Sequence, residues 1–99
     1  MDYNVIIKPD AEKDINHAVE WYHDQNKNLV LPLLNEIENG IHKITDNPKH
    51  FQKRYHEIRI IFTEKFPYGI YYTLEESNIY VHAVLHNKQN PKNFSKRLK

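Results

Sequence analysis

The chain has 99 residues, of which 39% are hydrophobic, 27% are charged and none is cysteine, and its formal net charge is +1. This length predicts one domain with one core, and the composition excludes a disordered chain and a domain held by disulfides or thiolate metal sites. No apolar stretch approaches the roughly 20 residues of a membrane helix, and the N-terminus lacks the pattern of a secretory signal, so we expect a cytoplasmic protein.

The first predicted elements are a short strand and a helix. Residues 3–7 are rich in β-branched and aromatic side chains, which favours a strand that ends before Pro9. Pro9 followed by Asp10 is typical of a helix start, because proline suits the first turn and an acidic side chain is favourable there. Apolar side chains then recur at helical spacing, which predicts an amphipathic helix over residues 10–24.

A second amphipathic helix is predicted over residues 29–46, where apolar side chains again recur at every third or fourth position. Pro32 is compatible with a helix only in its first turn, which sets the start of this helix. Asn47-Pro48 ends it, because the residue before a proline disfavours the helical conformation. The short polar break between the two helices predicts an antiparallel hairpin.

Three further strands are predicted over residues 56–62, 68–74 and 79–85, separated by short polar segments. Consecutive strands with short links form an antiparallel meander, and the N-terminal strand can add an edge to it. The prediction is therefore an α+β domain in which a two-helix hairpin packs on a small antiparallel sheet, in the order β-α-α-β-β-β. We assign residues 1–99 to this domain, with 87–99 as a basic C-terminal tail.

Positive charge is concentrated in two segments. Residues 1–76 carry nine Lys and Arg against thirteen Asp and Glu, whereas residues 77–99 carry five basic residues and no acidic one. A second basic cluster lies around the start of the predicted 56–62 strand, where Glu57 is the only acidic residue nearby in the sequence. Basic patches attract nucleic acids or acidic protein segments; the alternative is a solvated tail without a partner. The candidate binding residues are Lys49, Lys53, Arg54 and Arg59 in the cluster, and Lys88, Lys92, Lys96 and Arg97 in the tail.

Metal and nucleophilic sites find little support among the remaining residues. His82 and His86, four apart on a predicted strand, share a face but lie roughly 13 Å apart at about 3.3 Å per residue, so they cannot hold one ion together. With no cysteine and no tight His/Asp cluster, we predict no metal site and no cofactor. The only glycines, Gly40 and Gly69, allow neither a Gly-flanked serine nucleophile nor a Gly-rich phosphate loop.

Arg59 and His86 are the candidate catalytic residues if the protein acts on RNA. Arginine binds phosphate through two hydrogen bonds, and histidine exchanges a proton near neutral pH, which suits phosphodiester cleavage by an internal 2′-hydroxyl. In the alternative interpretation neither residue is catalytic: Arg59 is a solvent-facing strand residue, and His86 anchors the tail by a hydrogen bond.

Motifs spread over nearly the whole chain share their order and spacing with one family. They resemble the ParE/RelE toxin superfamily of type II toxin–antitoxin systems, and more closely its ParE-like plasmid-stabilisation branch. The motifs are Ala11, Asp14-Ile15, Trp21-Tyr22, Ile44, Asn47-Pro48, Ile58-Arg59, Phe66-Pro67-Tyr68-Gly69-Ile70-Tyr71-Tyr72, Val81-His82-Ala83-Val84-Leu85-His86, Pro91, Phe94 and Arg97. The fold of this superfamily, a helical hairpin on an antiparallel sheet, agrees with the periodicity of the sequence.

The resemblance implies a growth-inhibiting toxin whose partner is a cognate antitoxin, often an acidic segment laid over a groove, with a toxin–antitoxin hetero-oligomer as the assembly. ParE-like members poison DNA gyrase, RelE-like members cut messenger RNA on the ribosome, and a third possibility is an inert or scaffolding member. The RelE-like ribonucleases resemble one another in an arginine just before the apolar run of the third strand. The matching position here is Tyr68, and a neutral phenol does not replace a guanidinium in stabilising a phosphorane. We therefore expect a ParE-like, non-enzymatic toxin.

Overall fold

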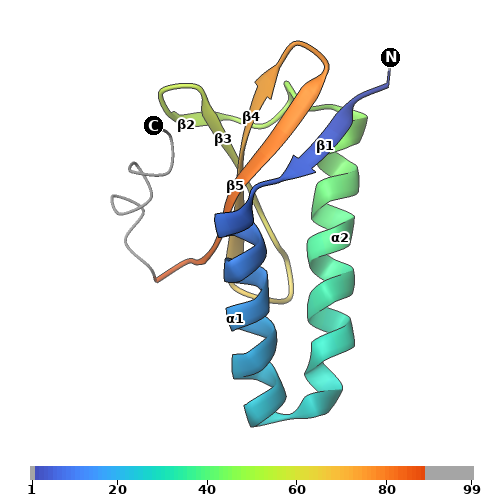
Figure 1. Ribbon diagram of the computed structural model, residues 1–99, viewed down its shortest axis with the longest axis vertical. Helices are drawn as coiled ribbons and strands as arrows, with labels where there is room; N and C mark the ends of the chain where they lie inside the picture. The colour runs from blue at the N-terminus through green and yellow to red at the C-terminus, as the bar shows by residue number, and fades with distance from the viewer. Residues whose placement is uncertain (1, 89–99) are drawn as a thin grey trace.

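The computed structural model of the protein describes residues 2–88. Its elements follow the predicted order, with one additional short strand (Figure 1). They are β1 (Asn4–Ile7), α1 (Pro9–Gln25), the 3₁₀-helix η1 (Lys27–Leu29), α2 (Val30–Asp46), β2 (Lys53–Tyr55), β3 (Ile58–Phe62), β4 (Tyr68–Glu75) and β5 (Asn78–His86).

Both helices begin and end close to the predicted residues, and they lie side by side in opposite directions (Figure 1). Pro9 occupies the first turn of α1, where its missing N–H costs no hydrogen bond, and Asp10 and Glu12 lie in the same turn. α2 ends at Asp46, immediately before Asn47-Pro48. Within residues 2–88, neither helix combines the length and the apolar composition needed to cross a membrane.

The strands form one five-stranded sheet in the order β1-β5-β4-β3-β2. β3, β4 and β5 make the predicted antiparallel meander, the additional strand β2 extends it at one edge, and β1 takes the predicted position at the other edge. β1 pairs with β5 in parallel, so the sheet is mixed rather than wholly antiparallel. The apolar pattern of β1 predicts a strand but does not set its direction, which depends on a neighbour more than 70 residues away in the chain.

The predicted strand over residues 56–62 begins two residues later, as β3, and it forms a hairpin with the additional strand β2. β2 ends at Tyr55, His56 adopts a left-handed backbone conformation with φ of 49°, and β3 begins at Ile58. A positive φ is uncommon outside glycine and here turns the chain back on itself. The sequence pattern missed β2 because all three of its side chains are exposed, so no apolar alternation marks it.

Apolar side chains are buried on both faces of the sheet. The larger cluster lies between the sheet and the helices. Because alternate strand residues point to opposite faces, a second cluster lies on the other side. The first cluster includes Ala11, Ala18, Leu33, Ile37, Ile44, Ile61, Ile70, Tyr72, Ile79 and Val81. The second consists of Ile58, Ile60, Tyr71, Ala83 and Leu85.

A β-bulge separates the two histidines that sequence spacing places on one face. The register between β4 and β5 shifts between Tyr71 and Tyr72, which inserts His82 as an extra residue. His82 Nε2 lies 2.8 Å from Thr73 Oγ1, on the face away from the helices. His86 instead faces α1. The expectation that the two histidines share a face was therefore wrong.

Candidate functional site

Arg59 forms hydrogen bonds with the segment that follows α2. Its Nη1 donates to the backbone carbonyl of Phe51 at 2.6 Å and to that of Lys49 at 3.2 Å. Tyr72 lies opposite Arg59 on β4 and donates its hydroxyl to the carbonyl of Pro48 at 2.7 Å. Burial raises the pKa of Tyr72 to about 12, so its hydroxyl remains a donor at any physiological pH. The half-buried Arg59 side chain thus points to the helix side and contacts backbone carbonyls.

His86 lies at the end of β5 and lines a cavity of about 270 Å³ between α1 and the sheet. Its ring packs edge-on against the ring of Tyr68, with 5.4 Å between the ring centroids. Its Nδ1 accepts a hydrogen bond from the backbone N–H of Lys88 at 3.1 Å. These contacts agree with the anchoring alternative for His86. The cavity is lined by Asp14, His17, Ala18, Trp21, Tyr68, Val84 and His86.

The structure does not bring Arg59 and His86 to one site. Arg59 lies opposite Tyr72, and His86 lies opposite Tyr68, which is four residues away along β4. At about 3.3 Å per residue, this spacing alone separates the two positions by roughly 13 Å. The Arg59 guanidinium is in addition directed at the carbonyls of Phe51 and Lys49, and His86 at the cavity beside α1. Among residues 2–88, no three His, Asp or Glu side chains gather closely enough to hold a metal ion.

Three residues of the predicted basic cluster, Lys49, Lys53 and Arg54, are exposed at the β2 edge of the sheet. The fourth, Arg59, is half-buried on β3 and does not share this exposed surface. Lys53 Nζ pairs with Glu57 Oε2 at 2.7 Å, and this contact lowers the pKa of the Glu57 carboxyl. The Arg54 guanidinium lies 5.6 Å from the centroid of the exposed Phe62 ring. The cluster therefore presents cationic groups beside an exposed aromatic ring, with one of its charges partly balanced by Glu57.

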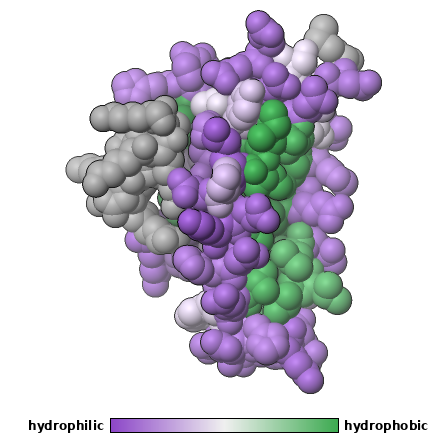
Figure 2. All heavy atoms as spheres, viewed as in Figure 1, coloured by the Kyte–Doolittle hydropathy of each residue, from purple (hydrophilic) through white to green (hydrophobic). Residues whose placement is uncertain are grey.

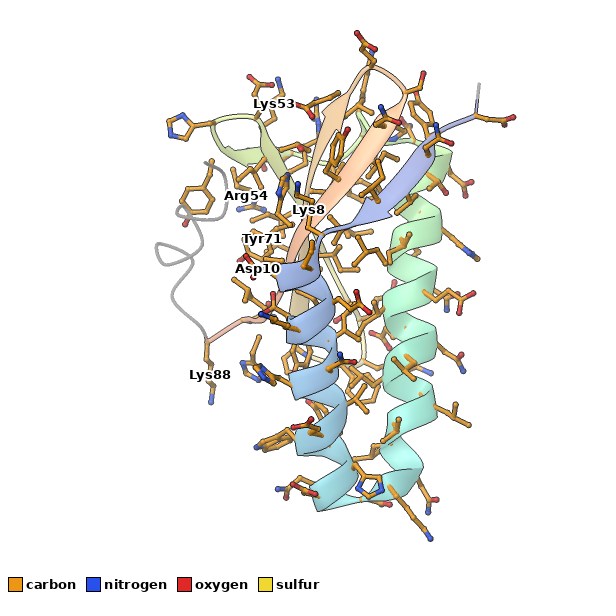
Figure 3. All side chains as sticks on the ribbon, viewed as in Figure 1. Lys8, Asp10, Lys53, Arg54, Tyr71 and Lys88 are labelled. Atoms are coloured by element: carbon orange, nitrogen blue, oxygen red, sulfur yellow. The ribbon has the colours of Figure 1, made fainter. Side chains whose placement is uncertain are left out.

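The candidate residues of the tail lie apart from this cluster or outside the described residues. Figure 3 shows Lys53 and Arg54 near β2 and Lys88 well away from them, beyond the end of β5. Lys88 is exposed. Lys92, Lys96 and Arg97 lie outside residues 2–88, as does most of the predicted tail.

Sequence analysis named His86 as a candidate but missed the cavity beside α1 and the contribution of the α1 residues to it. Asp14 accepts a hydrogen bond from the backbone N–H of Val84 at 3.0 Å. β1 pairs with β5 only as far as Val81, and beyond that point α1 lies along the edge of β5. Trp21, with 57% of its surface exposed, lies at the same cavity. A signal was present, because Trp21 falls outside the apolar stripe of its helix.

Comparison with protein families identifies the chain. The family of the ParE toxin of type II toxin–antitoxin systems, parDE, matches residues 5–91, which is most of the sequence. The chain belongs to the ParE toxin family. Membership confirms the predicted resemblance and the prediction of a toxin component whose partner is an antitoxin. It favours the ParE-like assignment over the RelE-like and scaffolding alternatives.

The fold of this ParE-family chain is similar to a solved structure titled as the chromosomal ParDE toxin–antitoxin system from P. aeruginosa. The TM-score is 0.76, and the similarity covers 85% of this chain and 95% of the other. The two sequences are 10% identical, so this similarity concerns the fold alone. A search of curated proteins finds no match.

Proposed function

We propose that this ParE-family toxin acts in the cytoplasm and inhibits growth by binding and poisoning DNA gyrase, without cutting RNA. The observation that carries the proposal is that Arg59 forms hydrogen bonds within the protein. Its guanidinium is engaged by the backbone carbonyls of Phe51 and Lys49, while His86 lies at another part of the sheet. Because residues 2–88 do not bring these two candidate catalytic residues together, we infer that the toxin acts by occupying a surface of its target.

The requirements of RNA cleavage explain why this geometry matters. A general acid must come within about 2.6–3.2 Å of the oxygen that it protonates, and a cation must contact the same phosphate group. The separate positions of Arg59 and His86 on the sheet, and the hydrogen bonds of Arg59 to backbone carbonyls, argue against their meeting both conditions at one phosphate. Tyr68, at the position of the ribonucleases' arginine, is 7% exposed and packs against the rings of Tyr22 and His86. Burial raises the pKa of the Tyr68 hydroxyl, which keeps the side chain neutral.

The mode of inhibition can be tested by expressing the full chain in a related bacterium. We expect the DNA-damage response to rise and messenger RNA to remain intact, and co-expression of the antitoxin should restore growth. Cuts in translated messages that follow the codon phase and disappear in His86→Gln would instead establish a RelE-like nuclease. Normal growth at a high level of folded protein would support the scaffolding alternative.

We also propose that an acidic segment of the antitoxin binds the basic cluster at β2 and the tail that begins at Lys88. Complementary charge increases the rate of association and selects the partner. The test is the affinity of the antitoxin for Arg54→Glu, with Lys27→Glu as the control because Lys27 is exposed outside this cluster. Losing one exposed ion pair weakens binding by roughly fivefold. Equal affinities for the two variants would contradict this placement of the antitoxin.

A further inference from the structure

The two edges of the sheet differ in how they are protected from another strand. At one edge, β2 carries Lys53 and Arg54, and its pairing with β3 contains a register shift. Charges and bulges of this kind prevent the addition of a further strand. At the other edge, β1 consists of Asn4-Val5-Ile6-Ile7, with no charged residue. Among residues 2–88, β1 has a strand neighbour on one side only, which is β5.

The outer side of β1 offers both hydrogen-bonding groups and apolar surface. Asn4 N–H donates to the carbonyl of Ser77 at 2.8 Å and Lys8 N–H donates to that of Val81 at 3.0 Å, so every second residue faces β5. The intervening residues, Val5 and Ile7, therefore direct their backbone groups to the outer edge. The side chains of Ile6 and Ile7 are 38% and 40% exposed. Figure 2 shows hydrophobic side chains gathered over β1 and continuing between the two helices.

We propose that a second copy of this chain covers this edge, with the two β1 strands antiparallel about a two-fold axis at Ile6. In this register Ile6 lies opposite Ile6 of the second copy, and Val5 lies opposite Ile7. Val5 and Ile7 carry the outward backbone groups, so both of these pairs are hydrogen-bonded, and the Ile6 pair is not. A two-fold interface uses the same patch on both copies, which a short strand of uniform apolar character satisfies.

Charge complementarity at the ends of the strand supports the same register. Lys8 follows β1, and Asp2 precedes it. With Ile6 on the axis, Lys8 of each copy lies diagonally across from Asp2 of the other, a position within reach of long side chains. The basic cluster that suits an acidic antitoxin segment lies at β2, the opposite edge of the sheet, so charge does not direct that partner to β1.

A single introduced cysteine tests the register directly, because the natural chain contains none. In Ile6→Cys the two substituted positions would face each other as a non-hydrogen-bonded pair, with Cα atoms about 4.5 Å apart. This separation allows a disulfide. We expect Ile6→Cys to form a covalent dimer under mild oxidation of the full-length chain.

Ile7→Cys is the matched control, because Ile7 belongs to the same strand and is equally exposed. In the proposed register the two cysteines introduced by this control are offset by two residues along the strands, which places their Cα atoms beyond the limit of about 7 Å for a disulfide. Ile7→Cys should therefore cross-link at least about tenfold more slowly. Equal rates would indicate random collision and would overturn the register.

Sedimentation of the full-length wild-type chain measures the association itself. We expect a dimer at tens of micromolar, and Ile6→Lys should weaken it at least about tenfold, because like charges directly opposite each other are unfavourable. A wild-type chain that remains monomeric throughout this range would refute the proposal. If that monomer also bound the antitoxin more weakly after Ile6→Lys, the occupant of the edge would be the antitoxin.

Discussion

Arg59 and Tyr72 lie opposite each other on β3 and β4 and both donate hydrogen bonds to the segment that follows α2. Together they contact the carbonyls of Pro48, Lys49 and Phe51. This segment, residues 47–52, belongs to neither a helix nor a strand. The pair therefore attaches the segment between α2 and β2 to the sheet, which gives Arg59 a structural role.

Tyr72→Phe and Arg59→Met are expected to destabilise the fold. Tyr72→Phe leaves the buried Pro48 carbonyl without its donor, which costs about 1–3 kcal/mol, and Arg59→Met removes hydrogen bonds from a charged group, with a similar cost. Because both residues hold one segment, the double variant should lose less than the sum of the single losses by at least about 0.5 kcal/mol. Chemical denaturation measures all three values. Strict additivity would show that the two side chains act independently.

Gly40 provides a test of the packing between α2 and the sheet. A Cβ at this position would lie 2.7 Å from Cδ1 of the fully buried Ile70. Gly40→Ala gains about 1 kcal/mol of helix propensity but overpacks the core at a cost of about 1–3 kcal/mol, so a net loss of stability is expected.

The same substitution should change sign when Ile70 is shortened. Ile70→Val removes Cδ1 and alone costs about 0.5–1.5 kcal/mol. In that background the new methyl group has space, so Gly40→Ala should stabilise the protein by about 1 kcal/mol. The free energy of unfolding of the four proteins gives the comparison. A loss of the same size in both backgrounds would contradict the close contact at Ile70.

Local periodicity predicted most of the fold because each helix and each long strand buries a regular set of apolar side chains. Ile37 and Ile44 on α2 and Val81 on β5 are examples, and all are buried. β2 escaped prediction because its pairing depends on a turn at His56 and not on burial. The parallel pairing of β1 is likewise a property of the assembled sheet.

The candidate site was less predictable, because its residues are defined by partners distant in sequence. The basic cluster at Lys53 and Arg54 follows from local charge, and the structure places it on the exposed edge strand. No local pattern in the sequence predicts the hydrogen bonds of Arg59 to the segment after α2. The cavity at His86 requires α1 to pack against the end of β5, and only Trp21, lying off the apolar stripe, indicated it.

His82 should make the stability of the fold depend on pH. Burial lowers the pKa of His82, with Lys8 adding to this effect and Glu75 opposing it. The unfolded chain then takes up a proton near pH 6.5 that the folded chain resists, so the free energy of unfolding falls as the pH drops below about 6.5. Denaturation curves between about pH 7.5 and 5.5 measure this loss, and His82→Gln should reduce it. An unchanged pH dependence in His82→Gln would exclude His82 as its source.

His86→Gln distinguishes anchoring from catalysis. Glutamine keeps an acceptor for the Lys88 N–H, although it loses the edge-on contact with Tyr68, so the segment after β5 should remain attached. Loss of a general acid usually lowers a rate by about 10²–10⁴, enough to abolish growth inhibition by a nuclease. We expect His86→Gln to retain most of the toxicity, measured as the growth rate at matched levels of folded protein. A deletion of residues 88–99, which removes five positive charges, should reduce toxicity more, because we expect these candidate binding residues to contact the target as well as the antitoxin. The reverse order, with His86→Gln inactive and the truncated chain toxic, would assign the proton-transfer role to His86 and contradict the gyrase proposal.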